Sequence, residues 1–153
     1  MLQFLLKTAL FNGVAEEHAK VIAVFSELTV MAAGEHAIVE GDAHQHHDLL
    51  LLVEGEVIVE TRFSPLPDAM KFNLHAIGNE MFGEIAWILG GKRSASVKCR
   101  TSCKFIKING SKFFEYCNAH PAVGVELMTR IAAVTAQRVT HLTDLLRNKD
   151  LAS

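Results

Sequence analysis

The chain has 153 residues, half of them hydrophobic, and its charges almost cancel, with fifteen Lys and Arg against seventeen Asp and Glu. This length suits one domain and leaves little room for a second large core, so we expect a single domain over residues 1–153. No basic block is present to follow a phosphate backbone, and direct nucleic-acid binding is therefore not expected.

Two short helices are predicted at the N-terminus, within residues 1–27. Apolar residues recur at helical spacing through MLQFLLKTALF, Asn12-Gly13 breaks the pattern, and a second helix is predicted from about Ala15 to Phe25. The first segment contains Lys7, has no basic leader and is shorter than the roughly 20 apolar residues that cross a bilayer. It is therefore expected to pack on the domain, and no membrane span is expected.

From about residue 28 to residue 109 the apolar runs become short and rich in β-forming residues, and turn residues separate them. Short strands without crossover helices predict an antiparallel sandwich or barrel. The runs are LTVM, AIV, LLLLV, VIVE, FNLHAI, SASVKC and KFIKI, with turns at Ala33-Gly34, Gly41-Asp42, Glu54-Gly55, Ser64 to Asp68 and Gly78-Asn79.

The three cysteines, Cys99, Cys103 and Cys117, contain no CxxC pair. An odd number of such residues fits free thiols in a reducing compartment better than a disulfide framework or a zinc site. We therefore expect a cytoplasmic protein whose cysteines lie in the core.

Helical spacing returns over residues 111–150, first up to Cys117 and then, after Pro121, in one long segment to about Arg147. Two apolar stripes follow the long segment, and the alternating steps of three and four in the first are typical of a coiled-coil seam. Either one wide face covers a single core, or one stripe packs on the strands and the other on a second copy of the helix. We predict the second arrangement, a homodimer. The first stripe is Val125, Met128, Ala132, Thr135, Val139, Leu142 and Leu146, and the second is Leu127, Ile131, Val134 and Leu145.

The stretch FGEIAWILGGKRSASV, residues 82–97, places one acid and one arginine in apolar surroundings. Its spacing predicts a short helix from Gly83 to Leu89, opening directly from a strand. The start of a helix attracts an anion through its unpaired N–H groups and its dipole. Arg93 adds a full positive charge, and its planar fork can bind two phosphate oxygens together. Ser94 can donate one more hydrogen bond to the phosphate.

Glu84 is unsuited to a phosphate contact because like charges repel. An ionised carboxylate only accepts hydrogen bonds, so its natural partner is a hydroxyl such as that of a ribose. The pair thus predicts a sugar with an attached phosphate as the ligand. The alternative is that Glu84 and Arg93 pair with each other across the loop, and the spacing alone leaves both open.

The same stretch resembles the phosphate-binding cassette of the cyclic nucleotide-binding domains, found in bacterial catabolite activators, kinase regulatory subunits and cyclic-nucleotide-gated channels. The resemblance covers most of the chain: LFNGVAEEH resembles the entry helix, AAGEHAIVEGD the opening strands and LLLLVEGEVIVE the central hairpin, with Gly55 at its turn. It implies a mostly β fold, a jelly-roll barrel with short N-terminal helices and a long C-terminal helix. It also implies a regulatory sensor that binds a cyclic nucleotide, catalyses no reaction and signals through that helix.

By this resemblance Glu84 receives the ribose 2′-hydroxyl and Arg93 clamps the cyclic phosphate. Ser94 stands where members that favour cGMP often have threonine, which makes cAMP the predicted ligand. The residues expected to line the ligand are Gly83, Ile85, Ser94 and Ala95.

Two departures from the family pattern limit which of the family's features can be assigned to this chain. The nine-residue step from Glu84 to Arg93 resembles the kinase and channel members, and the sequence ends with the long helix where a catabolite activator continues into a helix-turn-helix. The output domain or partner is therefore not defined.

An ungapped extension from Arg93 places Arg138-Val139 where catabolite activators direct a Thr-Ser pair at the adenine. Arg138 either caps the purine by stacking or is a solvated surface residue, and we keep it as a ligand-binding candidate.

The histidines of HQHHD suggest a different function. His44 and His46 would give the HxH pair of a metal-binding cupin, a β barrel that is often an enzyme. Leu49 to Leu52 replace the glutamate expected next, and a second histidine motif is missing, so we expect a polar loop, no metal and no enzyme. A degenerate domain of the same fold, serving only for dimerisation or docking, is a further alternative, against which the intact cassette argues.

Overall fold

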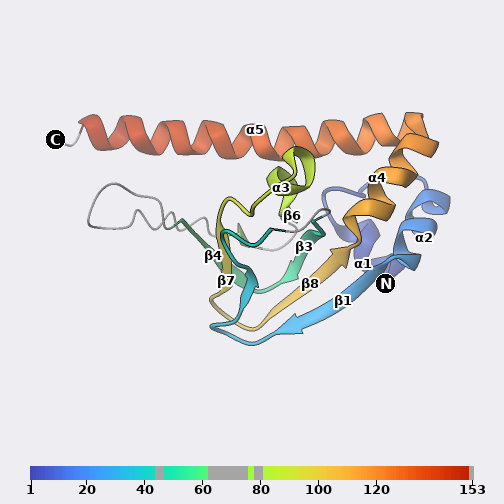
Figure 1. The fold of residues 1–153 in the computed structure, drawn as a ribbon, viewed down its shortest axis with the longest axis horizontal. Coiled ribbons are helices and arrows are strands. Elements are labelled where there is room, and N and C mark those ends of the chain that lie inside the picture. The colour runs from blue at the N-terminus through green and yellow to red at the C-terminus, as the bar shows by residue number, and fades with distance from the viewer. Residues whose placement is uncertain (44–46, 62–75, 78–80, 152–153) are drawn as a thin grey trace.

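The computed structural model describes residues 1–43, 47–61, 76–77 and 81–151 (Figure 1). Strands occupy the middle of the chain and helices its two ends, as the sequence predicted. The helices are α1 (Leu2–Lys7), α2 (Glu16–Val24), α3 (Glu84–Leu89), α4 (Gly110–Ala119) and α5 (Pro121–Leu151). The strands are β1 (Ser26–Met31), β2 (His36–Ile38), β3 (Leu49–Glu54), β4 (Glu56–Glu60), β5 (Ala76–Ile77), β6 (Met81–Phe82), β7 (Ser96–Cys99) and β8 (Cys103–Ile108).

The strands form two four-stranded antiparallel sheets. Their orders are β1-β8-β3-β6 and β2-β7-β4-β5, so most consecutive strands belong to opposite sheets. This alternation is typical of a jelly roll, in which the chain winds between two facing sheets. The predicted fold class is thereby confirmed, although the described strands do not close into a continuous barrel.

One expectation about the strands is wrong. The segment LLLLVEGEVIVE was expected to form a hairpin, but β3 pairs with β8 and β6, whereas β4 pairs with β7 and β5. The turn at Gly55 therefore carries the chain from one sheet to the other instead of joining two paired strands. The reason lies in β3 itself, whose first four residues are buried on both faces and so require cover on each side.

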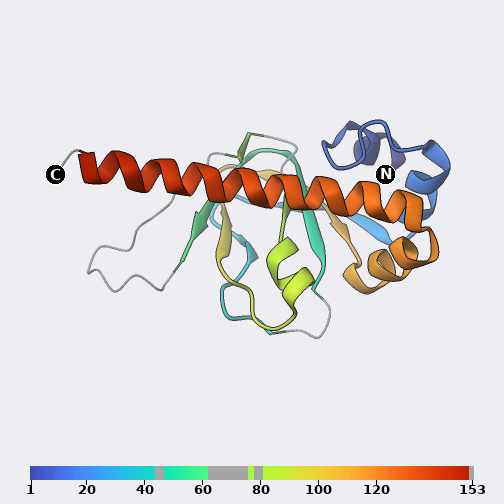
Figure 2. The same cartoon turned by 90° about the horizontal axis from the view of Figure 1, so that it is seen from above.

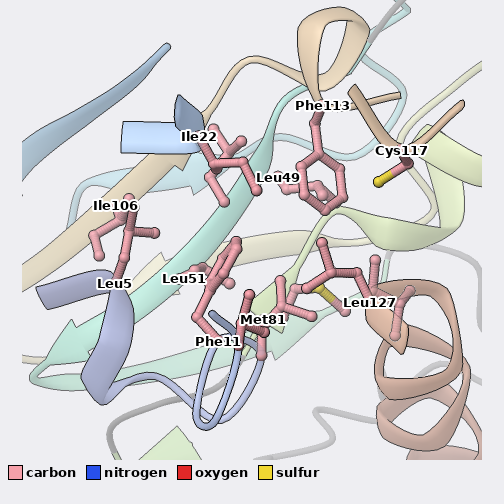
Figure 3. Packing of buried hydrophobic residues seen from close by; sticks show 14 of the residues in the cluster. Leu5, Phe11, Ile22, Leu49, Leu51, Met81, Ile106, Phe113, Cys117 and Leu127 are labelled. Carbon is pink, nitrogen blue, oxygen red and sulfur yellow. The ribbon is translucent and has the colours of Figure 1, made fainter. Parts of the chain in front are cut away.

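Two hydrophobic cores meet at β3. Leu49 and Leu51 point to the outer core, between this sheet and the helices, where they lie with Phe113 and Leu127 (Figure 3). Leu50 and Leu52 point to the inner core, between the two sheets, which also contains Phe82, Val97, Cys99, Cys103 and Phe105. The buried positions of Cys99, Cys103 and Cys117 confirm their assignment to the core, and burial raises the pKa of the Cys117 thiol to about 11.

Helix α5 runs along the sheets and lies beside α3, as two perpendicular views show (Figures 1 and 2). Of the two apolar stripes, the second faces the core, because Leu127 and Ile131 are fully buried and Val134 packs against the same core. Val125, Val139 and Leu146 of the other stripe are exposed. Within the described residues, no helix has the length and hydropathy needed to cross a membrane.

Several expectations concern residues outside the described ranges. These are the turns at Ser64 to Asp68 and Gly78-Asn79, most of the run FNLHAI, and the histidines His44 and His46. For His44 and His46 the predicted polar loop therefore stays a prediction, whereas His47 is described and is buried, with Nε2 2.5 Å from Gly91 O.

Candidate functional site

The cassette is a strand, a short helix and a loop that lead into a second strand. β6 ends at Phe82, Gly83 caps the start of α3 in the left-handed conformation (φ 89°), and Gly90 ends the helix. The loop then enters β7, whose pairing with β4 and β2 fixes its direction. The helix and its boundaries agree with the prediction from the sequence.

Arg93 is held by its backbone and by its guanidinium. Its backbone N–H donates to Asp42 O (2.8 Å), and its carbonyl accepts from the N–H of Gly41 (2.9 Å). In the side chain, Nη1 donates to Gly83 O (3.0 Å) and Nη2 to Asp48 O (2.9 Å). Among the described residues, both acceptors of the guanidinium are neutral carbonyls, so they orient the cation without cancelling its charge.

Burial lowers the pKa of Arg93, because it disfavours the charged form, and the carboxylates of Asp48, Asp42 and Glu84 oppose this effect. An arginine stays protonated through such shifts. A partly desolvated cation oriented by carbonyls is suited to bind an anion that enters the site.

Gly83 is required by the close approach of Arg93. A Cβ at this position would overlap the guanidinium and would lie 3.0 Å from Asp48 O, and the positive φ is itself unfavourable for other residues. The glycine of the motif thus lets the arginine lie directly against the backbone where α3 begins.

Glu84 is buried and forms an ion pair with the long C-terminal helix. Its side chain is only 3% exposed, and its Oε1 lies 2.7 Å from Nη1 of Arg138, whose side chain is 18% exposed. Arg138 also donates to Met81 O, and its guanidinium lies 4.9 Å from the centre of the Phe82 ring. The direct Glu84–Arg93 pair that the sequence left open is not formed between these two described side chains. The solvated surface position considered for Arg138 is wrong.

A cavity of about 320 Å³ opens between the cassette, the inner faces of the strands and α5. All seven predicted ligand-binding residues line it: Gly83, Glu84, Ile85, Arg93, Ser94, Ala95 and Arg138. Among the described residues that line it, the ionisable groups are Glu84, Arg93 and Arg138.

Other walls of this cavity come from residues that no sequence motif predicts as ligand-binding. Ile38, Val59 and Val97 come from three strands, and Thr135 and Val139 come from α5. The strand residues were recognisable only as inward positions of an alternating pattern. Thr135 and Val139 were assigned to the coiled-coil seam, and no local motif marks them as lining residues.

Solved structures of other proteins resemble the whole chain. The chain matches a cyclic nucleotide-binding domain from Methylobacillus flagellatus with a TM-score of 0.81 and 21% identity, over 97% of this chain and 81% of the other. It has the fold of a cyclic nucleotide-binding domain. The catabolite activator protein of Thermus thermophilus matches this fold with a TM-score of 0.69 and 22% identity, over 92% of this chain and 62% of the other.

The cyclic nucleotide-binding fold of the chain also matches the regulatory domain of Toxoplasma gondii PKA, crystallised with cAMP. Its TM-score is 0.69 at 16% identity, over 92% of this chain and 48% of the other. No protein-family model matches the sequence, and a search of curated proteins gave no match. The three structures are named as a cyclic nucleotide-binding domain, a catabolite activator and a PKA regulatory domain.

Proposed function

We propose that the chain is a cyclic nucleotide sensor that binds its ligand in the 320 Å³ cavity without catalysing a reaction. One observation carries the proposal: an arginine fork oriented by carbonyls and a buried carboxylate line the same cavity. Arg93 suits a phosphate, and Glu84 can accept from a ribose hydroxyl through Oε2 while Oε1 remains bonded to Arg138. A ribose with an attached phosphate carries both groups, and a nucleotide contains this unit.

The charge and size of the cavity favour a cyclic nucleotide over an open one. A phosphodiester carries one negative charge, which the single positive charge of the Arg93 fork can match, whereas a phosphate monoester carries about −1.5 to −2 at neutral pH. The volume lies at the lower end of the roughly 300–1,000 Å³ usual for small-molecule sites. Apolar walls from Ile38, Val59 and Val139 suit the faces of a base.

We infer cAMP as the preferred ligand from Ser94, which lines the cavity where family members that favour cGMP often have threonine. Isothermal titration calorimetry with cAMP, cGMP and 5′-AMP tests both the function and the preference. We expect cAMP to bind more tightly than cGMP, and 5′-AMP to bind at least about tenfold more weakly than cAMP because its extra charge is not matched.

The outcomes of this titration separate the alternatives. Tighter binding of cGMP would overturn only the preference. No binding of any of the three nucleotides would favour the non-binding dimerisation or docking module. A metal assay on the same sample addresses the remaining alternative, because stoichiometric zinc or iron would favour the cupin-like enzyme.

We propose that the signal leaves through α5, because Arg138 joins this helix to Glu84. A ligand that bonds Glu84 changes the surroundings of the ion pair, and only such a differential contact can shift the position or order of the helix. We propose that an output domain or partner receives this signal. We also propose a reducing cytoplasmic location, which is inferred from the cysteines.

A homodimer through α5 is the second part of the proposed assembly. Val125, Val139 and Leu146 lie on the predicted seam and are exposed in the single chain, so a second copy of the helix would cover them. Sedimentation-velocity ultracentrifugation is expected to show a dimer in the micromolar range, and Leu146→Glu is expected to shift it toward monomer. Only monomer at high micromolar concentration would exclude this dimer.

A further inference from the structure

Asp48, immediately before β3, uses three of its oxygens in three different contacts. Its backbone carbonyl accepts from Arg93 Nη2 (2.9 Å), and its Oδ1 accepts from the N–H of Gly110 (3.1 Å). Its Oδ2 lies 3.5 Å from Nζ of Lys107. The residue that orients the arginine is therefore also bonded to the first residue of α4.

Gly110 is the point where the cassette helix and the Asp48 segment meet α4. Its carbonyl accepts from the indole N–H of Trp87 in α3 (2.9 Å), and its N–H is the group that Asp48 binds. A Cβ at this position would overlap the carbonyl of His47 and would lie 2.7 Å from Cδ1 of Trp87. The three segments are thus packed together at a residue that has no space for a side chain.

The carbonyl of Asp48 needs this anchor to hold Arg93 in place. After Asp48, the pairing of Leu49 with Ile108 begins the β3–β8 ladder and fixes the chain on that side. The bond from the carboxylate to Gly110 fixes the residue from a second direction. Misplacement of a binding group by even about 1 Å sharply lowers the strength of its contacts, so the orientation of this peptide matters for an arginine that must meet a phosphate.

The charge of Asp48 makes a direct role in ligand binding unsuitable. A carboxylate beside Arg93 repels an incoming phosphate and thereby opposes binding. The value of Asp48 must therefore come from the bonds that it makes, and an uncharged residue that keeps those bonds should serve as well.

We propose that Asp48 is a positioning residue for Arg93: its carboxylate fastens the segment before β3 to Gly110 of α4 and so sets the carbonyl that orients the guanidinium. This inference rests on the proposed cyclic nucleotide site. It assigns a role in binding to a residue outside the cassette, 45 positions before the arginine.

Three variants and cAMP titration test the proposal. Asp48→Ala removes the bond to Gly110 and is expected to weaken cAMP binding about five- to tenfold. Asp48→Asn keeps an acceptor for that N–H and removes the negative charge, so its affinity should stay within about threefold of the wild type. Its lost contact with Lys107 is half-exposed and contributes little.

Asn109→Ala is the matched control. Asn109 Oδ1 accepts from the N–H of Lys112 (3.0 Å), so this variant also removes a side-chain cap from the start of α4, but it removes no bond to Arg93 or to the segment that holds it. It should lower thermal stability about as much as Asp48→Ala while leaving cAMP affinity within about twofold. Equal losses of affinity in the two variants would show a general effect of α4 and overturn the proposal.

Two further measurements test whether Asp48 affects binding through the side chain of Arg93. In an Arg93→Ala background, Asp48→Ala should cost less than about twofold in affinity, since it acts through the missing side chain. In ¹⁵N-edited NMR without ligand, the side-chain N–H signals of Arg93 should shift or exchange faster in Asp48→Ala but not in Asn109→Ala. Unchanged signals, or an Asp48→Ala loss of the same size in both backgrounds, would overturn the inference. A wild type that binds no cyclic nucleotide would instead refute the proposed function, and the NMR comparison would still decide the positioning.

Discussion

Arg93→Ala is expected to weaken cAMP binding by about 2–5 kcal/mol, because it leaves the ligand phosphate in a partly desolvated site without its main cation. The guanidinium lines the cavity and makes hydrogen bonds only to the carbonyls of Gly83 and Asp48 among the described residues. The variant therefore loses a cation without breaking an ion pair of the fold. Calorimetric titration with cAMP measures the change in affinity.

Two other arginine variants show whether the effect is specific. Arg93→Lys keeps the charge but not the fork, and it should fall between the wild type and Arg93→Ala. Arg100→Ala removes a cation that lies outside the cavity and 3.8 Å from Glu56 in a half-exposed pair, so affinity should not change. If Arg93→Ala left the affinity within twofold of the wild type, the site assignment would be wrong even though the fold is right.

The cassette was predictable because its chemistry is local. Glu84 and Arg93 lie nine positions apart, and a strand, one helix of six residues and a loop leave few ways to place them. The β-forming run SASVKC likewise predicted the strand that follows the loop. Short-range spacing and turn chemistry decide such a segment almost without the rest of the chain.

The partners of the two charged residues were not predictable in the same way. Arg138 meets Glu84 across 54 positions, and Asp48 meets Arg93 across 45. Both contacts depend on how α5 and β3 pack against the cassette, which is set by the burial of Leu49, Leu127 and their neighbours and not by any local pattern. The same packing explains why β3 and β4 belong to different sheets although their sequence suggests a hairpin.

Arg138→Met is expected to lower the free energy of unfolding by about 3 kcal/mol, because removal of one partner leaves the buried carboxylate of Glu84 without its ion pair. Methionine keeps an apolar stem to cover Phe82, so the loss reports the charge and its hydrogen bonds more than the packing. The double variant Glu84→Gln/Arg138→Met should recover most of this stability. Arg147→Met, on the exposed side of the same helix, should change it by less than about 0.5 kcal/mol. Urea unfolding of the wild type and of these three variants measures the free energies of unfolding.

The same variant tests whether α5 senses the ligand. In the wild type, Arg138 fixes Glu84 in the orientation that a ribose hydroxyl would meet, so Arg138→Met should weaken cAMP binding about tenfold. Linkage requires the reverse effect too: cAMP should slow hydrogen exchange in α5 around Arg138, and the variant should lose this protection. If cAMP bound the variant as tightly as the wild type and protected α5 equally in both, the Glu84–Arg138 pair would be a contact of the fold alone. The signal would then have to reach the helix by another route, and the packing of α3 against α4 through Trp87 and Gly110 is one that the structure offers.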